Sequence, residues 1–415
     1  MGYVGFPLAM EFASAGFSVT GIDLNRNKVN VINHGGSHIP DIDPADVSPL
    51  VKKGLLKATT EFDVLASADL MSICVPTPLN KTKNPDVSFI LAAAGQIRKH
   101  LRKGQLIVLE STTYPGSTEE LIRPMLEETG LKVGEDFFLA FSPERVDPGN
   151  KVYTIKNTPK VIGACTPECL KYAEAYYSAI VEQVVGVSST DAAEMVKLLE
   201  NTFRAVNIGL VNEVALMCDV LGIDVWEVIE AAATKPFGYM PFRPGPGLGG
   251  HCIPIDPHYL SWKLKSLNYY ARFIELAGEI NSSMPAYVAR KVADALNEAE
   301  RSVKGSKILL LGVAYKKDID DIRESPALDV ARLLQVKGAA VSFHDPFVQE
   351  FHLNEVALKS QELTPELVSE ADCVVLTTDH SDFDYPMILD NAGLVVDTRN
   401  AFGARGLKDT KIVKL

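Results

Sequence analysis

The sequence lacks any apolar run long enough to cross a membrane, and its first residues lack the pattern of a signal peptide. Its six cysteines are scattered through 415 residues, which is not the pattern of a disulfide framework. Cys165 and Cys169 are four residues apart, but no second ligand pair follows, so no metal site is expected. These absences predict a reduced, cytoplasmic protein.

Clusters of positive charge are also missing, because lysine and arginine concentrate on no stretch and the net charge is −12. This argues against nucleic acid and anionic membranes as partners, although a few local basic residues would still bind an anionic ligand. The composition, 47% hydrophobic and 23% charged, is that of a globular enzyme. A chain of this length is too long for one core and predicts two or three domains.

The first 25 residues have the pattern of a dinucleotide-binding unit. Gly2 and Gly5, with Tyr3 and Val4 between them, match the end of a G-x-G-x-x-G loop, and an apolar helix pattern follows. The short strand 18–23 then ends at Asp23, placed to bind a ribose diol. A glycine would let the backbone approach a pyrophosphate at the helix N-terminus. We therefore predict NAD rather than NADP as cofactor, with an ordinary strand-to-helix turn as the alternative.

One part of this unit is absent: no strand and no first glycine precede Gly2. In a doubly wound sheet that strand is central. We therefore expect the functional protein to begin roughly 8–12 residues upstream, with an apolar strand and the missing glycine.

Further strand-and-helix units follow, and polar residues gather where each strand is predicted to end. The segments 68–78, 104–118 and 136–149 read as strands of a parallel sheet. Their ends carry Pro76 and Thr77, then Thr112, then Glu144 and Arg145. The carboxyl ends of such strands form a binding crevice. Taken alone, Thr112 and Glu144 could equally be a helix cap and a turn salt bridge.

The middle of the chain is helical, and a second α/β unit follows it. Apolar residues recur at helical spacing through 190–222, with Gly222 as the stop. Lys197 and Asn201 share one face of this helix, and a solvated face is the ordinary interpretation of such a pair. Residues 306–346 then read as strand, loop, helix and strand, with Lys316 and Lys317 in place of a dinucleotide loop.

The run "GPGLGGHCIPIDPHYL", residues 245–260, joins four glycines to a cysteine and a carboxylate. The glycines would let the backbone approach a ligand closely. Pro254 is expected in the first turn of a helix, and a thiol near a helix N-terminus has a lowered pKa. Cys252 could then be a nucleophile with Asp256 one turn later, whereas most lone cysteines are small buried hydrophobes. A nicotinamide cofactor and a thiol together suggest oxidation through a thiohemiacetal and a thioester.

These residues resemble the UDP-glucose/GDP-mannose dehydrogenase family along nearly the whole chain. The segments that carry the resemblance are "VPTP", "ESTTYPGST", "SPERVDPG", "EMVKLLENTFR", "GPGLGGHCIPIDP" and "KKDIDDIRESPALDV". The resemblance implies two Rossmann-like doubly wound parallel-sheet domains joined by a central helical domain. We expect an NAD-binding domain at 1–187, a helical dimerisation domain at 188–303 and a nucleotide-sugar domain at 304–415.

The resemblance also implies roles for individual residues. Cys252 resembles the thiolate that forms the covalent adduct, and Lys197 and Asn201 resemble the groups that stabilise the oxyanion. Asp256 and Thr112 would hold a water molecule, and Glu144 resembles the base of thioester hydrolysis. Arg323 would reach the cofactor phosphates. The residues expected around the nucleotide-sugar are Glu144, Arg145, Lys197, Asn201, Arg243, Gly249, Lys316 and Arg399.

Within this family, residues 235–263 and 273–281 most resemble the branch that oxidises UDP-N-acetylglucosamine. The expected reaction is a four-electron, NAD-dependent oxidation of the sugar C6 alcohol to a carboxylate, for surface polysaccharide precursors, by a homodimer or higher homo-oligomer. UDP-N-acetylmannosamine and UDP-glucose are the alternative substrates. A catalytically impaired nucleotide-sugar-binding protein is the alternative of another class. A nucleotide-sugar epimerase is disfavoured, because the central helix has no Tyr-x-x-x-Lys pair.

Overall fold

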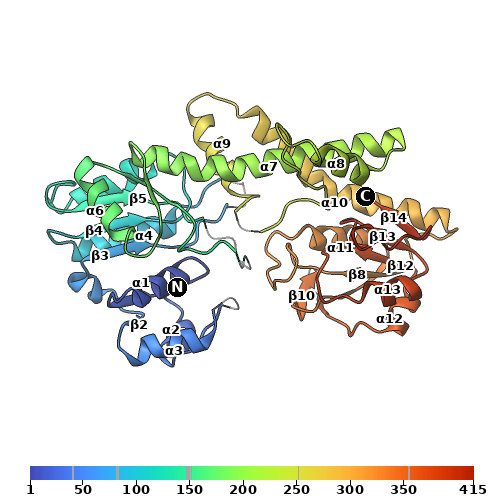
Figure 1. The fold of residues 1–415 in the computed structure, drawn as a ribbon, viewed down its shortest axis with the longest axis horizontal. Coiled ribbons are helices and arrows are strands. Elements are labelled where there is room, and N and C mark those ends of the chain that lie inside the picture. Colours follow the sequence, from blue (N-terminus) through green and yellow to red (C-terminus); the bar gives the residue numbers. More distant parts are fainter. Residues whose placement is uncertain (40–41, 81–83, 146–149, 151, 251, 354–355) are drawn as a thin grey trace. The chain divides into compact units, whose positions relative to one another are not determined.

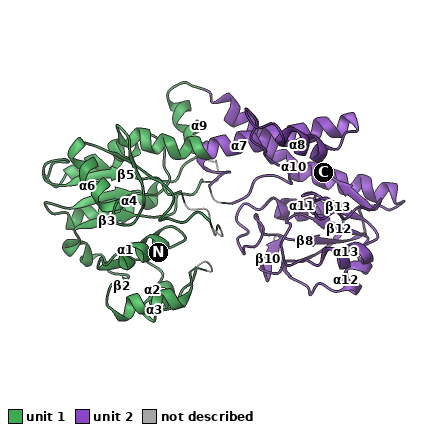
Figure 2. Ribbon diagram, viewed as in Figure 1, with its two compact units in different colours: residues 1–200, 258–269 green, residues 201–257, 270–415 purple. Residues whose placement is uncertain are grey.

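A computed structural model describes residues 1–39, 42–80, 84–145, 150, 152–250, 252–353 and 356–415 (Figure 1). The chain divides into two compact units (Figure 2). Unit 1 contains residues 1–200 and 258–269, and unit 2 contains residues 201–257 and 270–415. Among the described residues, none of the helices combines the length and apolar composition that a bilayer-spanning helix needs.

Unit 1 alternates strands and helices as the sequence predicts. Its elements are α1 (Gly5–Ser14), β1 (Val19–Ile22), α2 (Arg26–Asn33), α3 (Pro44–Lys52), β2 (Leu56–Thr59), η1 (Asp63–Ser67), β3 (Leu70–Ile73), α4 (Ser88–His100), β4 (Leu106–Leu109), η2 (Thr118–Ile122), α5 (Arg123–Glu127), β5 (Phe138–Phe141), β6 (Lys160–Ala164), α6 (Pro167–Tyr177) and β7 (Val184–Gly186).

The strands of unit 1 form two sheets. Strands β1 and β2 pair in parallel, and a second sheet has the order β3-β4-β5-β6-β7. The expected parallel order holds for β3, β4 and β5, whereas β6, which lies outside the three predicted segments, runs antiparallel to β5. The last residues of the predicted segment 136–149 lie outside the described residues.

Helices cover the larger sheet because its strands are apolar on both faces. All four residues of β4 are buried, and they pack with residues of α4 and α6 in one cluster. Helix α1 contributes Leu8 and Phe12 to this cluster. It turns Phe6, Ala9 and Ala13 towards a second cluster with α2, α3 and β2. Helix α1 therefore connects the two sheets of unit 1 through its apolar side chains.

Two helices carry the chain across the division between the units. Helix α7 (Thr190–Leu221) ends one residue before Gly222, whose φ of 69° supplies the left-handed stop that the sequence predicts. Helix α9 (Asp256–Ser266) begins within unit 2 and ends within unit 1. The three-domain division into 1–187, 188–303 and 304–415 remains a prediction.

After α7, the described residues of unit 2 include helices α8 and α10 and then a second α/β arrangement. The remaining elements are α8 (Val225–Ala233), α10 (Arg272–Glu298), β8 (Lys307–Leu311), α11 (Pro326–Val336), β9 (Ala340–His344), β10 (Glu350–Leu353), β11 (Val356–Lys359), α12 (Pro365–Glu370), β12 (Cys373–Leu376), α13 (Tyr385–Asn391), β13 (Val395–Asp397), η3 (Gly403–Arg405) and β14 (Ile412–Lys414).

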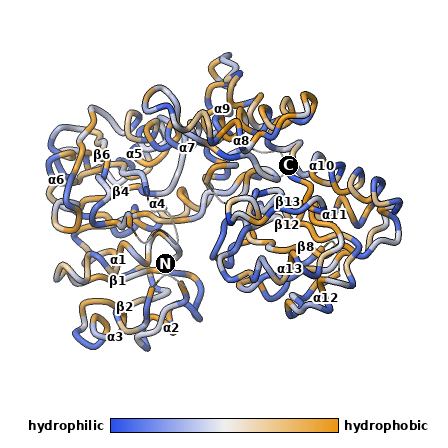
Figure 3. Tube along the Cα trace, turned by 45° about the vertical axis from the view of Figure 1, so that its right-hand side comes forward, coloured by the Kyte–Doolittle hydropathy of each residue, from blue (hydrophilic) through white to orange (hydrophobic). Residues whose placement is uncertain are grey.

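The main sheet of unit 2 is parallel and covered on both faces. Its order is β14-β13-β12-β8-β9, and an antiparallel pair, β10 and β11, lies outside it. Ile308 and Leu310 pack with α10 and α11, whereas Leu309 and Leu311 pack with α12 and α13. The apolar strands β8 and β12 appear as orange stretches in Figure 3. A strand buried on both faces needs such a continuous apolar run.

Candidate active site

In unit 1, polar residues follow three neighbouring parallel strands. Thr77 lies beyond the end of β3, Thr112 beyond β4, and Glu144 beyond β5, so all three follow the same edge of the sheet. Ser111 joins the first two loops, because its Oγ lies 2.8 Å from both the amide nitrogen and the carbonyl oxygen of Val75. Pro76 is exposed and Thr77 is buried. The structure therefore gathers these predicted residues at one sheet edge.

The predicted NAD residues lie at the start of α1 and the end of β1. A Cβ atom on Gly5 would lie 3.2 Å from the Cβ of Cys74, so this glycine lets the helix pack closely against the segment after β3. A Cβ atom on Gly2 would meet nothing within 4 Å. Tyr3 and Val4 complete the turn before the helix. This open backbone at a helix N-terminus fits a pyrophosphate.

Asp23 follows β1 directly, as predicted. Its carboxylate accepts a hydrogen bond from the Asn25 amide at 2.8 Å. Burial raises the pKa of Asp23, and the hydrogen bond from the Asn25 amide lowers it. An ionised carboxylate at this strand end is the acceptor that a ribose diol needs, so the residues present fit NAD.

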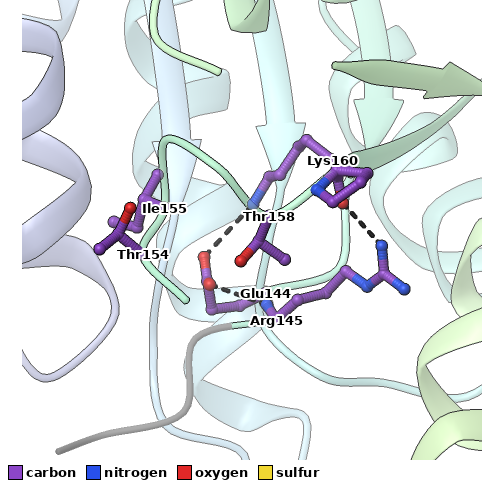
Figure 4. A pocket seen from close by; sticks show the side chains of 7 residues that line it. Glu144, Arg145, Thr154, Ile155, Thr158 and Lys160 are labelled. Carbon is purple, nitrogen blue, oxygen red and sulfur yellow. Dashed lines mark hydrogen bonds and ion pairs between the residues drawn. The ribbon is translucent and has the colours of Figure 1, made fainter. Parts of the chain in front are cut away.

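Lys197 and Glu144 make a direct contact within unit 1. The ammonium of Lys197 donates a hydrogen bond to the main-chain oxygen of Glu144 at 2.7 Å. Arg145 lies beside them, and its guanidinium donates to the Pro159 carbonyl at 2.6 Å and to Glu200 at 2.5 Å. Glu144 and Arg145 line a small pocket together with Lys160, Thr154, Ile155, Thr158 and Pro159 (Figure 4). Lys197 is therefore partly buried and bonded, unlike a lysine on a solvated face.

Cys252, Asn201 and Asp256 lie together in unit 2. The main-chain oxygen of Cys252 accepts from the Asp256 amide at 2.8 Å, which closes one turn before α9. The buried carboxylate of Asp256 accepts from Asn201 Nδ2 at 2.5 Å, and Cys252 is exposed. The turn thus presents an exposed thiol one turn from a fixed carboxylate, as predicted.

The placement of Pro254 in the first helical turn is wrong. Helix α9 begins at Asp256, and Pro254 lies in the turn that precedes it. Pro257 is the proline of the first helical turn, where its missing N–H costs no intrahelical hydrogen bond.

The glycine run packs against protein within unit 2. Cβ atoms on Gly249 and Gly250 would lie 2.5 and 2.8 Å from the side chain of Tyr315, and one on Gly245 would lie 2.6 Å from Arg399 Nη1. The Gly250 amide donates to the Arg323 carbonyl at 3.0 Å. The close approach that these glycines permit is therefore to the loops that follow β8 and β13.

The predicted nucleotide-sugar cations, and Arg323, which was predicted to reach the cofactor phosphates, occupy different environments in unit 2. Arg399 donates from Nε to the Thr377 carbonyl at 2.8 Å, and burial lowers the pKa of its guanidinium. Arg323 pairs with Asp321, with Nη2 and Oδ2 2.6 Å apart. Lys316 is half-buried after β8, and Arg243 is exposed. Arg399 and Arg323 thus flank the glycine run.

Sequence reasoning missed a buried group of charges in unit 1. Lys160 lies between the carboxylates of Glu110 and Glu144, at 2.8 and 3.3 Å. Glu110 ends the apolar run of β4, and Lys160 begins the buried strand β6. A charge at the end of an apolar strand is a weak signal, but the pairing of residues 50 apart in sequence is visible only in the fold.

Comparisons with known proteins agree with this arrangement. Three models of the UDP-glucose/GDP-mannose dehydrogenase family match: the NAD binding domain at 1–181, the central domain at 191–283 and the UDP binding domain at 309–404. A UDP-N-acetyl-D-glucosamine 6-dehydrogenase of Pseudomonas aeruginosa is 35% identical, over 92% of this chain and 90% of its own.

Two further relatives have names that specify a different sugar. A UDP-N-acetyl-D-mannosamine dehydrogenase of Yersinia pestis is 38% identical over 92% of this chain and 93% of its own. The solved structure of a UDP-D-ManNAc dehydrogenase from Pyrococcus horikoshii is 34% identical, with a TM-score of 0.89, and the match covers 100% of this chain and 96% of that one. The chain therefore belongs to the UDP-glucose/GDP-mannose dehydrogenase family of oxidoreductases and has that family's NAD-binding, central and UDP-binding domains.

Proposed function

We propose that this protein oxidises the C6 alcohol of a UDP-sugar to a carboxylate through a covalent adduct on Cys252. The observation that carries the proposal is the turn before α9, which presents an exposed thiol one turn from Asp256, a buried carboxylate held by Asn201. A thiol needs this exposure to reach a substrate carbon. The family's NAD-binding and UDP-binding domains supply the two ligand classes that the reaction requires.

The proposed reaction balances as two oxidations and one hydrolysis. The C6 alcohol loses a hydride and a proton to give an aldehyde, and the Cys252 thiolate adds to the aldehyde carbon. The thiohemiacetal loses a second hydride and proton to give a thioester. Water adds to the thioester carbon, the C–S bond breaks, and the carboxylate leaves. When bound, NAD supplies the oxidant, with one molecule accepting the hydride in each oxidation.

We assign the surrounding residues roles that suit their chemistry. Lys197 stabilises the negative oxygen of the tetrahedral adducts, and Asn201 donates a hydrogen bond to the same oxygen. Asp256 and Thr112 orient the water. Glu144 accepts the proton that this water loses on attacking the thioester. The contact of Lys197 with the Glu144 carbonyl and that of Asn201 with Asp256 support these assignments, because each fixes a reacting group.

For the ligands, we assign Gly2 to Gly5, Asp23, Pro76 and Thr77 to the NAD side, with Thr112 and Arg323. Arg145, Arg243, Gly249, Lys316 and Arg399 are assigned to the UDP-sugar. The crowded packing of Gly249 against Tyr315 and of Gly245 against Arg399 supports the second set, because it fixes the loops that carry Lys316 and Arg399.

UDP-N-acetylglucosamine is the substrate we propose, with UDP-N-acetylmannosamine as the second candidate. The Pseudomonas aeruginosa relative supports the first, and the Yersinia pestis and Pyrococcus horikoshii relatives support the second. The product would serve as a surface polysaccharide precursor. We also propose a cytoplasmic location, which is supported by the absence of a disulfide among the six cysteines, all of them within the described residues.

We propose that the protein forms a homodimer through α7. Phe203, Leu210, Met217 and Leu221 recur along this helix at spacings of seven and four residues, and their side chains are exposed. Such spacing places them along one side of a helix, and a row of large apolar side chains in water favours burial against another surface. A second copy of the chain would present the same row.

The test is a substrate panel with NAD and UDP-N-acetylglucosamine, UDP-N-acetylmannosamine or UDP-glucose. NADH absorbance gives the rate, and mass spectrometry identifies the sugar product. The proposal predicts fastest oxidation of UDP-N-acetylglucosamine and two NADH for each carboxylate formed. Faster oxidation of UDP-N-acetylmannosamine would transfer the assignment to the second candidate. Binding of the sugars without NADH formation would instead indicate a nucleotide-sugar-binding protein.

A further inference from the structure

A buried cation, the Lys160 ammonium, lies beside the Glu144 carboxylate in unit 1 (Figure 4). The ammonium of Lys160 is 2.8 Å from Glu110 Oε2 and 3.3 Å from Glu144 Oε2. The exposed fractions are 6% for the Lys160 side chain, 0% for Glu110 and 12% for Glu144. Charges this far from water are costly unless they are paired, so two carboxylates and one ammonium form a coupled unit.

Glu110 fixes the position of this cation. One oxygen of Glu110 accepts from Lys160, and the other accepts from the Tyr177 hydroxyl at 2.6 Å. Burial alone would lower the pKa of Lys160, but the two carboxylates outweigh burial and raise it. Lys160 therefore carries its charge throughout the range in which enzymes work.

Glu144 is held at several of its atoms. Its Oε2 faces Lys160, its Oε1 accepts from the Arg145 amide at 2.7 Å, and its main-chain oxygen accepts from Lys197. The cluster also contains the titratable groups Cys74 and Tyr177, whose pKa values are raised by burial and by the nearby carboxylates, so both stay neutral. Within the described residues, the charges close to the Glu144 carboxylate include Lys160 and, on the other side of that ammonium, Glu110.

We infer that Lys160 is a positioning residue that holds Glu144 ionised and aimed for proton transfer, with Glu110 limiting the strength of that hold. The inference rests on the proposed function, in which Glu144 accepts a proton from water during thioester hydrolysis. A cation beside a carboxylate favours its ionised form but also weakens it as a base. Glu110 competes for the same ammonium, so Glu144 stays ionised and keeps its basicity.

The test is the pH–rate profile of carboxylate release in single-turnover reactions with NAD and UDP-N-acetylglucosamine. Lys160→Met removes the cation, so the acidic limb should move to higher pH by roughly one unit or more. Glu110→Gln removes the competing negative charge, so the Lys160 ammonium acts on Glu144 alone. The acidic limb should therefore move to lower pH. Shifts in opposite directions identify an electrostatic role, because damage to the fold would slow both variants without reversing the shift.

Two further variants keep the test informative if a single substitution unfolds the protein. Lys160→Met removes the cation that pairs with buried Glu110, which could unfold the protein. The double variant Lys160→Met/Glu110→Gln avoids this problem because it removes both charges together. Its limb should lie between those of wild type and Lys160→Met. Lys160→Arg keeps the charge and should restore the wild-type limb. Thermal melting of each variant reports whether it is folded.

Coincident profiles for wild type and the folded variants would overturn the inference, as would a shift in Lys160→Arg equal to that in Lys160→Met. Glu144→Gln separates this failure from failure of the proposed function. If Glu144→Gln releases carboxylate at the wild-type rate, Glu144 is not the base and the assigned mechanism fails. If Glu144→Gln is slow while the Lys160 and Glu110 variants match wild type, only the positioning role is wrong.

Discussion

Asn201 donates a hydrogen bond to the buried carboxylate of Asp256. The hydrogen bond between them is 2.5 Å long, and the exposed fractions of Asn201 and Asp256 are 7% and 2%. Removing the donor from a buried carboxylate leaves that carboxylate poorly solvated. Asn201 is therefore expected to influence both folding and reaction.

We expect Asn201→Ala to lower the free energy of unfolding by about 1–3 kcal/mol, because Asp256 loses a buried donor. The rate of NADH formation should fall at least about tenfold, since the same donor is assigned to the oxyanion. Denaturant unfolding and steady-state rates measure the two effects. Asn207→Ala, on the same helix and bonded only locally to Phe203, is the control. Equal effects from both variants would contradict the assignment.

Several site residues could be predicted from the sequence because their chemistry is encoded locally. Cys252 and Asp256 are four residues apart, and the turn between them brings them together as expected. Lys160 and Glu110 could not be predicted, because their contact joins strands far apart in the sequence. The contact of the glycine run with Tyr315 was also not predictable, since the glycine spacing shows that something comes close but not which residue does.

At the scale of the element, the glycine run fixes the segment before α9 against the loop after β8. Gly250 has a φ of +86°, and an added Cβ would lie 2.8 Å from the Tyr315 ring. Alanine would therefore suffer both backbone strain and a clash. Gly238 has a φ of +68° with nothing within 4 Å of an added Cβ, which makes it a matched control for the strain alone.

Gly250→Ala should lower the free energy of unfolding by about 2–4 kcal/mol, and Gly238→Ala by about 1 kcal/mol. The difference measures the clash with Tyr315. Gly250→Ala should also slow oxidation, because Cys252 lies two residues later. Chemical denaturation and NADH formation provide both readouts. If the two alanine variants lose the same stability, the close contact with Tyr315 is not important.

The start of α7 carries a second element-scale feature, the buried carboxylate of Glu194. It accepts hydrogen bonds from the Gly116 amide at 2.7 Å and the Thr118 amide at 3.0 Å, so it connects α7 to the loop after β4. Burial raises the pKa of Glu194 to about 7, although these bonds oppose the shift. The folded protein therefore binds a proton more tightly here than the unfolded chain does.

Because the pKa of Glu194 is raised in the folded protein, the free energy of unfolding changes with pH in a known direction. The contribution of Glu194 is fully present below the unfolded pKa of about 4.5 and is lost as pH rises through about 7. From about pH 5 to about pH 8, the wild-type melting temperature should therefore fall relative to that of Glu194→Gln. Glu230→Gln, an exposed position in α8, is the control. Parallel melting curves for wild type and Glu194→Gln would contradict the prediction.

The fold of both units could be predicted at the level of elements. Strands β1, β3, β4, β5, β8 and β9 and helix α7 lie within their predicted segments, because continuous apolar runs and helical spacing are strong local signals. The antiparallel direction of β6 was not predictable, since strand direction depends on where the preceding loop returns the chain. The β10 and β11 pair lacks a comparable apolar signal, and most of its residues are exposed or alternate in burial.

At the scale of the whole molecule, the apolar row on α7 predicts the oligomeric state. Leu210→Glu places a charge in this row, so the proposed dimer should dissociate to monomers. Sedimentation equilibrium measures the mass directly. Val336→Glu, at the exposed end of α11, adds the same charge elsewhere and should leave the dimer intact. A monomeric wild-type protein, or a dimeric Leu210→Glu variant, would show that α7 is not the interface.

The covalent role of Cys252 is the central claim, and the most direct measurement is the mass of the enzyme during turnover. Protein mixed with NAD and UDP-N-acetylglucosamine is quenched with acid, and intact-mass and peptide analysis locate any adduct. The account predicts a sugar nucleotide bound to the peptide that contains Cys252. Cys252→Ser should stay folded, carry no adduct and form no carboxylate. Carboxylate formation by Cys252→Ser at the wild-type rate would contradict the account.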